Sequence, residues 1–269
     1  MGGATAVYEA FDSERIARTF DLRPPFPSFT RMSGEARLGR MIDHAHDLGA
    51  VREATERLLD AVGKLDNAAV AEPSRLPGWS RGHVLAHLSR NAEALGNVLR
   101  GLPMYASSET RDADIAAGAP RPAAEQLADL RATSDAFLAV SAEPADWSRT
   151  VTLRNGVTDS AARVPFRRWV EVDLHHVDLG IGYELEDLPA AFVEREIAFL
   201  ADRFLGNESV PATGLTDADG RTWSTGGGPP SDLVTVQGPA AELLGWLCGR
   251  RDGSALTVAG GPLPTLPPL

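Results

Sequence analysis

Cysteine is nearly absent from this 269-residue chain: Cys248 is its single thiol, so the chain cannot close a disulfide within itself. Such sparse cysteine usage is typical of a reducing compartment. No apolar run approaches the about 20 residues that a bilayer-spanning helix needs, and the N-terminal segment lacks the cationic start and apolar stretch of a secretory signal. These absences favour a cytoplasmic protein.

Positive charge is also in short supply, because 26 basic residues stand against 37 acidic ones and the formal net charge is -11. A nucleic-acid partner requires a cationic face, and an anionic membrane surface repels a chain of this charge. We therefore expect no nucleic acid and no membrane among the partners. We expect a monomer that acts on small molecules.

Length and composition predict an ordinary globular protein with two domains. A hydrophobic content of 43% over 269 residues is enough to bury a core and to form two domains. Residues 1–34 contain the turn cluster Pro24-Pro25-Phe26-Pro27 and are predicted to be a disordered N-terminal extension. Met32 is an alternative natural start.

Four segments carry apolar residues at helical spacing, and Ser80 is a favourable N-cap for the second. The predicted helices span about 38–65, 80–99, 123–140 and 165–181. The first is expected to be interrupted near Gly49. The stretch 104–122 is predicted to be an irregular polar crossover with a short helix near Ala113. Four helices with one long crossover predict a four-helix bundle over residues 35–187.

The pattern changes after Pro189, where a helix over 190–204 leads into short strands and Asp219-Gly220 marks a hairpin turn. The remaining predicted elements are strands at 233–236 and 255–258 and a short helix at 239–248. Residues 188–269 are therefore predicted to form a small α+β domain, and the whole chain is predicted to be mainly α with an α+β part.

Two of the predicted helices carry residue types that bind metal ions. Residues four apart share a helix face, so Glu171 and His175 point the same way, and His87 can meet them if the second and fourth helices are neighbours. Two imidazoles and one carboxylate leave coordination positions open, as catalytic zinc sites do. Other divalent ions also accept such a set. On spacing alone, an ordinary helix pair is the favoured explanation of Glu171 and His175.

The evidence that neighbouring polar residues take part in the site is weaker. Asp178 is a candidate for orienting a metal-bound histidine through its other ring nitrogen, although a solvated aspartate there is nearly as well supported. His83 sits in the first turn of its helix and is predicted to line the entrance. His176 and Asp173 are predicted to face away, with Asp173 solvated.

At the level of whole motifs, the chain resembles the mycothiol-dependent maleylpyruvate isomerase family, which has a DinB-like metal-binding four-helix bundle followed by a small α/β domain. The matching segments are Leu76–Leu88, Leu102–Tyr105 with Arg111–Ile115, Glu171–Leu179 and Gly249-Arg250. The resemblance implies metal ligands at His87, Glu171 and His175 and an essential arginine at Arg250. The loop around Tyr105 favours the isomerase over the S-transferases of the wider superfamily.

The reaction that the resemblance implies is cis–trans isomerisation of maleylpyruvate to fumarylpyruvate in gentisate degradation. A thiolate adds to the double bond, the resulting single bond rotates, and elimination restores the alkene. Mycothiol would supply the thiol, because Cys248 lies in an apolar helix and is predicted to be a core residue. A divalent metal, best matched by zinc, would lower the pKa of that thiol or polarise a substrate oxygen.

The substrate is a dianion at pH 7, and a guanidinium can grip a carboxylate through two parallel hydrogen bonds, which suits Arg250. Arg81 is an alternative partner, but we favour a solvated arginine there. Tyr105 and Arg111 are candidates to shape the thiol or substrate pocket. The competing hypotheses are a metal-dependent mycothiol S-transferase, a metal-dependent binding or stress-response module without activity, and a bundle without metal.

Overall fold

The structure is a computed structural model that describes residues 42–143 and 145–268, and the predicted extension over residues 1–34 lies outside them. The described chain divides into two compact units between Tyr183 and Glu184. Each unit is described by itself. None of the helices in the described ranges is long and apolar enough to cross a membrane.

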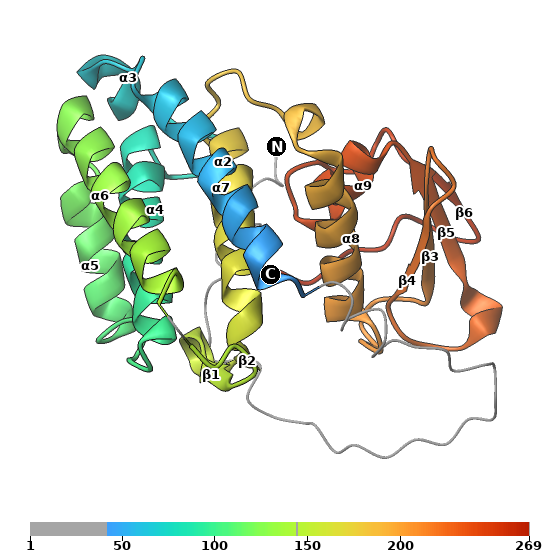
Figure 1. Cartoon of the computed structure of the whole chain (residues 1–269). Helices are drawn as coiled ribbons and strands as arrows, with labels where there is room; N and C mark the ends of the chain where they lie inside the picture. The colour runs from blue at the N-terminus through green and yellow to red at the C-terminus, as the bar shows by residue number, and fades with distance from the viewer. Residues whose placement is uncertain (1–41, 144, 269) are drawn as a thin grey trace. The chain divides into compact units, whose positions relative to one another are not determined.

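The first unit is built around four long helices, which confirms a helical bundle (Figure 1). These are α2 (His44–Val62), α4 (Arg81–Leu99), α6 (Ala123–Ser141) and α7 (Val164–Asp178). Helix α4 packs against α6 and α7, and α2 packs against the same two helices. The two helices that carry the candidate ligands, α4 and α7, are therefore neighbours.

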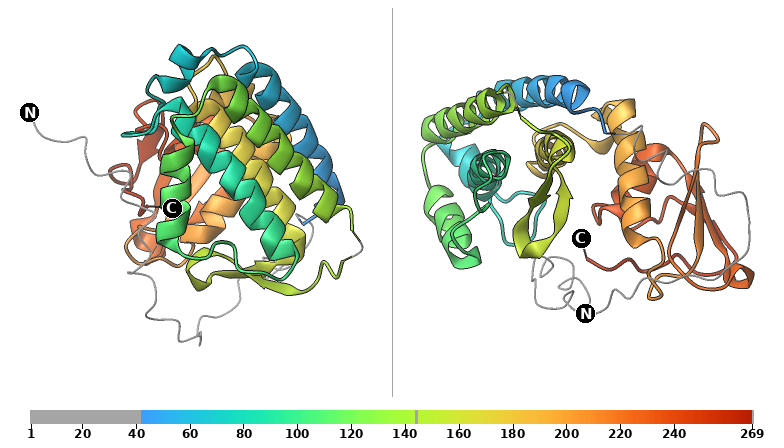
Figure 2. Two further views of the ribbon diagram at one scale, coloured as in Figure 1. Left: turned by 90° about the vertical axis from the view of Figure 1, so that its left-hand side faces the viewer. Right: turned by 60° about the horizontal axis from the view of Figure 1, so that its bottom comes forward.

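Shorter elements complete the first unit. They are α3 (Asn67–Ala71), α5 (Ser108–Gly118), β1 (Thr150–Thr152), η1 (Arg154–Gly156), β2 (Thr158–Ser160) and η2 (Ala161–Arg163). Strands β1 and β2 form an antiparallel hairpin before α7, and α5 covers the outer side of α4 in both views of Figure 2.

Two local predictions need correction. Helix α2 runs without a break through Gly49, because one helical glycine costs only about 1 kcal/mol relative to alanine and the buried face with Val51, Leu58 and Val62 outweighs it. The crossover contains an 11-residue helix, α5, and not merely a short one. Ser107 caps it by accepting a hydrogen bond from the backbone N–H of Thr110 at 3.1 Å.

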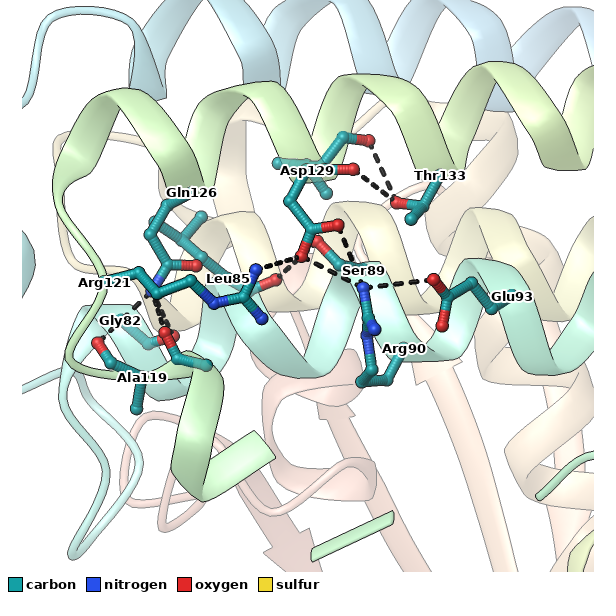
Figure 3. Close-up of polar contacts among 12 residues, drawn as sticks. Gly82, Leu85, Ser89, Arg90, Glu93, Ala119, Arg121, Gln126, Asp129 and Thr133 are labelled. Carbon is teal, nitrogen blue, oxygen red and sulfur yellow. Dashed lines mark hydrogen bonds and ion pairs between the residues drawn. The ribbon is translucent and has the colours of Figure 1, made fainter. Parts of the chain in front are cut away.

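Polar contacts fix the start of α4 against its neighbours (Figure 3). Gln126 Nε2 donates to the carbonyls of Gly82, Gly118 and Ala119 at 3.3, 2.8 and 3.2 Å. A β-carbon at Gly82 would lie 2.1 Å from the carbonyl oxygen of Ala119. Glycine is therefore required where the start of α4 meets the end of α5.

A second set of contacts joins α4 and α6 one to two turns further along. Asp129 on α6 accepts hydrogen bonds from Arg90 Nη2 at 2.9 Å and from Arg121 Nη1 at 3.0 Å, and Arg90 also pairs with Glu93 at 3.1 Å (Figure 3). These four charged residues lie on one partly exposed edge of the bundle. The pair of Arg90 with Asp129 joins α4 to α6 along that edge.

The second unit is an α+β domain, as predicted. Its elements are η3 (Leu185–Asp187), α8 (Ala190–Phe204), β3 (Thr213–Asp217), β4 (Thr222–Thr225), η4 (Pro230–Asp232), β5 (Val234–Gly238), α9 (Ala240–Leu247) and β6 (Thr257–Ala259). The sheet order is β4-β3-β5-β6, with β3 and β5 parallel and the outer pairs antiparallel. Helices α8 and α9 pack on the sheet (Figure 1). Cys248 is 5% exposed, which confirms it as a core residue.

The hairpin turn between β3 and β4 provides a pH-dependent test of this domain. Asp217 Oδ1 accepts from the backbone N–H groups of Asp219 and Arg221 at 3.0 and 2.8 Å, and Oδ2 accepts from Arg221 Nε at 2.6 Å. Burial raises the pKa of Asp217, but the hydrogen bonds from Arg221 outweigh it and leave the pKa below its ordinary value. A depressed pKa in the folded state stabilises the fold above the ordinary value, and this stabilisation is lost as the pH falls through the folded value.

We therefore expect Asp217→Asn to lower the free energy of unfolding by about 1–2 kcal/mol at pH 7 and by less at pH 3. Urea titrations of both proteins at the two pH values measure this difference. An equal cost at both pH values would show that the charge of Asp217 contributes nothing.

Candidate metal centre

Three side chains from α4 and α7 converge in the first unit. His87 Nε2 lies 2.9 Å from Glu171 Oε2, and His175 Nε2 lies 3.3 Å from the same oxygen. One ligand atom from each residue lies within 4.8 Å of the other two. The rings of His87 and His175 meet edge to face, with centroids 4.7 Å apart. Two nitrogens and one oxygen thus face a common point.

Local sequence explains the convergence. Glu171 and His175 are one helical turn apart on α7, which places them on one face. His87 projects from α4 toward that face because α4 and α7 are adjacent. The three side chains are 8%, 29% and 16% exposed for His87, Glu171 and His175. The site is therefore nearly closed on the α4 side and open to solvent at the carboxylate.

Burial and hydrogen bonding set the charge state of the three groups. Burial lowers the pKa of His87 to about 4, so its imidazole is neutral at pH 7. Burial alone would raise the pKa of Glu171, but hydrogen bonds with His175 and His87 outweigh it and hold the pKa well below the ordinary value. An ionised carboxylate beside a neutral imidazole is the ligand state that a divalent cation requires.

Asp178 supports His175 from behind. Its Oδ2 lies 2.8 Å from His175 Nδ1 and is 1% exposed. Burial would lower the pKa of His175, but the hydrogen bonds to Asp178 and Glu171 outweigh it and raise the pKa. With Nδ1 hydrogen-bonded to Asp178, Nε2 is the ring nitrogen that faces Glu171, and it can act as a metal ligand once it has given up its proton. This is the carboxylate–histidine arrangement that orients metal-bound imidazoles.

Arg111 and Tyr105 lie beside His87. Arg111 Nη2 is 3.2 Å from His87 Nδ1, the guanidinium is 5.8 Å from the centre of the Tyr105 ring, and Nη1 pairs with Asp112 at 2.7 Å. Arg111 is 8% exposed. Burial raises the pKa of Tyr105, so its hydroxyl is protonated at neutral pH. Both residues of the predicted pocket loop therefore adjoin the candidate ligands.

Other predicted residues have structural roles. His83 Nδ1 lies 2.8 Å from Ser80 Oγ and accepts from the Ser80 backbone N–H at 3.2 Å, so His83 forms the capping box of α4. His176 stacks on Tyr183 with ring centroids 4.1 Å apart. Neither residue belongs to the group of potential ligands within the described residues.

Two predictions of solvated charges are wrong. Asp173 is fully buried and accepts from Trp169 Nε1 at 2.7 Å and Arg57 Nη2 at 3.2 Å. Arg81 is 16% exposed and donates from Nε to the carbonyl of Leu179 at 2.9 Å. It thereby satisfies an end of α7 whose carbonyls would otherwise lack partners.

Arg168 is a buried cation that the sequence analysis did not single out. Its side chain is fully buried, and its guanidinium donates to the Leu88 carbonyl at 2.8 Å, Asn91 Oδ1 at 2.9 Å and Ser134 Oγ at 3.3 Å. Burial lowers its pKa to about 10, and Glu171 opposes that effect. Its place one turn before Glu171 on the buried face of α7 is the only sequence signal that could have pointed to it.

The candidate substrate arginine lies in the second unit. Arg250 follows α9, its backbone N–H donates to the Gly245 carbonyl at 2.7 Å, and its Nη1 donates to the Cys248 carbonyl at 3.2 Å. Arg251 instead pairs with Glu242 at 2.5 Å and Glu186 at 2.7 Å. The adjacent arginine is therefore engaged in holding η3 and α9 together.

The fold and the site define a helical-bundle protein with a candidate three-ligand metal centre and a small α+β domain. Residues 51–180 match the mycothiol maleylpyruvate isomerase N-terminal domain family, and residues 187–268 match the MDMPI C-terminal domain family. The chain belongs to the mycothiol-dependent maleylpyruvate isomerase family.

Solved structures agree with the family assignment. The crystal structure of the mycothiol-dependent maleylpyruvate isomerase is 26% identical, with a TM-score of 0.77, and the match covers 86% of this chain and 98% of that one. A histidine-to-alanine mutant of that isomerase matches with 25% identity, the same TM-score and the same coverage. Among curated protein sequences no significant match is found.

Asp178 provides a test of the ligand arrangement. Replacing it with alanine removes the acceptor that orients His175, so we expect Asp178→Ala to weaken zinc binding by about 10- to 100-fold. Competition against a chromophoric chelator measures the affinity. Asp173→Ala, on the same helix and equally buried, is the matched control and is expected to lower stability without changing zinc affinity. Equal zinc affinities for wild type and Asp178→Ala would contradict the arrangement.

Proposed function

We propose that this protein catalyses the mycothiol-dependent cis–trans isomerisation of maleylpyruvate to fumarylpyruvate. The main support for the proposal is the convergence of His87, Glu171 and His175. A chain with the domains of this family thereby holds three potential metal ligands that leave a coordination position open. The thiolate sulfur bonds to one alkene carbon, and the π electrons move onto the conjugated carbonyl as an enolate. The former double bond rotates as a single bond. Return of the electron pair breaks the C–S bond and releases the thiolate unchanged.

We propose that His87 Nε2, Glu171 Oε2 and His175 Nε2 hold one divalent cation. The donor set fits, because two imidazoles and one carboxylate match zinc with a coordination position left for a thiol. When bound, such an ion lowers the pKa of a neighbouring thiol, so that thiolate is available at neutral pH. Asp178 keeps His175 in the required tautomer.

Arg111 and Tyr105 are proposed to contact the thiol or substrate. A guanidinium only donates hydrogen bonds, so its contact with His87 Nδ1 needs the tautomer with the proton on Nε2. A cation on Nε2 requires the opposite tautomer, whose Nδ1–H cannot accept from Arg111. Ligand binding at His87 therefore frees a guanidinium donor of Arg111 for an anionic or carbonyl oxygen next to the Tyr105 ring.

Arg250 is proposed to bind a carboxylate of the dianionic substrate. Paired guanidinium–carboxylate hydrogen bonds fix both charge and orientation. Arg250 lies just after α9, and its guanidinium has donors in the fork that a carboxylate accepts.

The assay uses zinc-loaded protein, maleylpyruvate and a substoichiometric amount of mycothiol. NMR follows the two isomers, and a thiol reagent follows the mycothiol. We expect many turnovers for each thiol, with the thiol concentration constant. Consumption of one thiol per substrate would identify an S-transferase instead, and no conversion by the loaded protein would overturn the proposal.

A further inference from the structure

A cavity of about 560 Å³ lies within the first unit, between the segment that follows α4 and the hairpin of β1 and β2. One part of its wall is apolar and the other offers hydroxyl, amide and guanidinium groups. The residues that matter for its chemistry are Leu102, Met104, Leu153, Thr152, Arg154 and Asn155.

The cavity is connected to the candidate metal centre by two side chains. Tyr105 forms part of the cavity wall. Its ring lies 5.8 Å from the guanidinium of Arg111, which in turn lies 3.2 Å from His87 Nδ1. The cavity wall is thus two side-chain contacts away from His87.

The size of the cavity distinguishes between the two small molecules of the proposed reaction. Cavities of about 300–1,000 Å³ bury drug-sized ligands. A small keto-diacid would leave most of this space to water. Mycothiol, which is N-acetylcysteine joined through an amide to a glucosamine–inositol unit, is of the size that such a cavity encloses.

The chemistry of the wall also favours a sugar over a dianion. Arg149, one of the two arginines of the wall, donates to the carbonyls of Val98 and Leu99 and so caps the end of α4. The other arginine of the wall is Arg154, so the wall offers at most one further guanidinium for the two carboxylates of a diacid. The hydroxyl and amide groups of the wall, interspersed with apolar side chains, instead match the mixed polar and apolar surface of a polyol ring.

We infer that this cavity binds the glucosamine–inositol body of the thiol cosubstrate, with the cysteinyl end directed past Tyr105 toward the metal centre. The inference rests on the proposed use of mycothiol. It assigns to the β1 hairpin and the segment after α4 the role of selecting this thiol over smaller ones.

The test is the binding of S-methyl mycothiol to the zinc-loaded full chain by calorimetry. The methyl group blocks the sulfur, so binding reports on the body of the thiol and needs no turnover. Thr152→Trp fills the cavity from the exposed β1, where an aromatic residue is well tolerated. Thr158→Trp is the matched control, because Thr158 is the exposed β2 partner of Thr152 and is not part of the cavity wall.

We expect Thr152→Trp to weaken binding of S-methyl mycothiol by about tenfold or more and Thr158→Trp to leave it unchanged. In turnover, Thr152→Trp should raise the KM for mycothiol by a larger factor than the KM for maleylpyruvate. Equal binding by Thr152→Trp and wild type, no binding by wild type, or a raised KM for maleylpyruvate alone would overturn the assignment. Intact binding without isomerisation would overturn the proposed function and leave the cavity assignment standing.

Discussion

Replacing His175 with alanine is expected to remove the stoichiometric metal and, with it, isomerisation of maleylpyruvate. Loss of one of three ligands leaves Glu171 and His87 alone, and the activation of a thiol by the metal fails with them. We expect kcat/KM to fall by about 10³-fold or more, which corresponds to about 4 kcal/mol of lost transition-state stabilisation. Elemental analysis of the purified protein and the NMR assay measure the two effects.

The control is His46→Ala. His46 lies in the same unit on α2 and is exposed, and its ring lies edge-on to the Trp169 ring with centroids 6.0 Å apart. We expect this variant to keep one metal ion per chain and full activity. Full metal content and full activity in His175→Ala would contradict the ligand assignment, and equal losses in both variants would show that folding, not coordination, is affected.

Arg250→Ala is expected to produce the second large effect, this time without loss of metal. Removing one partner of a desolvated, hydrogen-bonded charge pair costs about 2–5 kcal/mol, or roughly 30-fold to several-thousand-fold in kcat/KM. Zinc content should stay at the wild-type value, because the first unit holds all three candidate ligands and Arg250 lies in the second.

Arg251→Ala is the matched control for that variant. It removes the ion pairs with Glu186 and Glu242, so we expect a lower melting temperature and little change in kcat/KM at a temperature where the protein is folded. Partial rescue of activity by Arg250→Lys would support a charge-based role. If Arg251→Ala lost activity and Arg250→Ala kept it, the assignment of the two arginines would have to be exchanged.

Local patterns predicted much of this fold. Helical periodicity, Ser80 as an N-cap and Asp219-Gly220 as a turn are short-range signals, and the elements that they predict are present. The pairing of Glu171 with His175 is equally local, since it follows from one helical turn. The continuous α2 and the length of α5 were mispredicted because packing outweighs the preference of a single glycine or of a polar stretch.

Contacts between distant segments could not be predicted in the same way. Arg81 reaches carbonyls about a hundred positions later in the chain, and Asp173 meets Arg57 on a helix far earlier in it. Arginine and aspartate are residue types that usually lie on the solvated surface. Only the fold shows the partners of Arg81 and Asp173. The convergence of His87 with Glu171 and His175 likewise depends on α4 and α7 being neighbours. Residue spacing cannot predict that adjacency, whereas a family resemblance can.

The most direct measurement is the absorption spectrum of the cobalt-substituted protein with and without mycothiol. We expect one Co²⁺ per chain, visible bands of the intensity that low coordination numbers give, and a new sulfur-to-cobalt charge-transfer band when mycothiol is added. His175→Ala should bind no stoichiometric Co²⁺, and its spectrum should show neither the visible bands nor the charge-transfer band. A protein that binds no stoichiometric cobalt, or whose cobalt spectrum does not respond to mycothiol, would contradict the claim that these three side chains present a metal to a thiol.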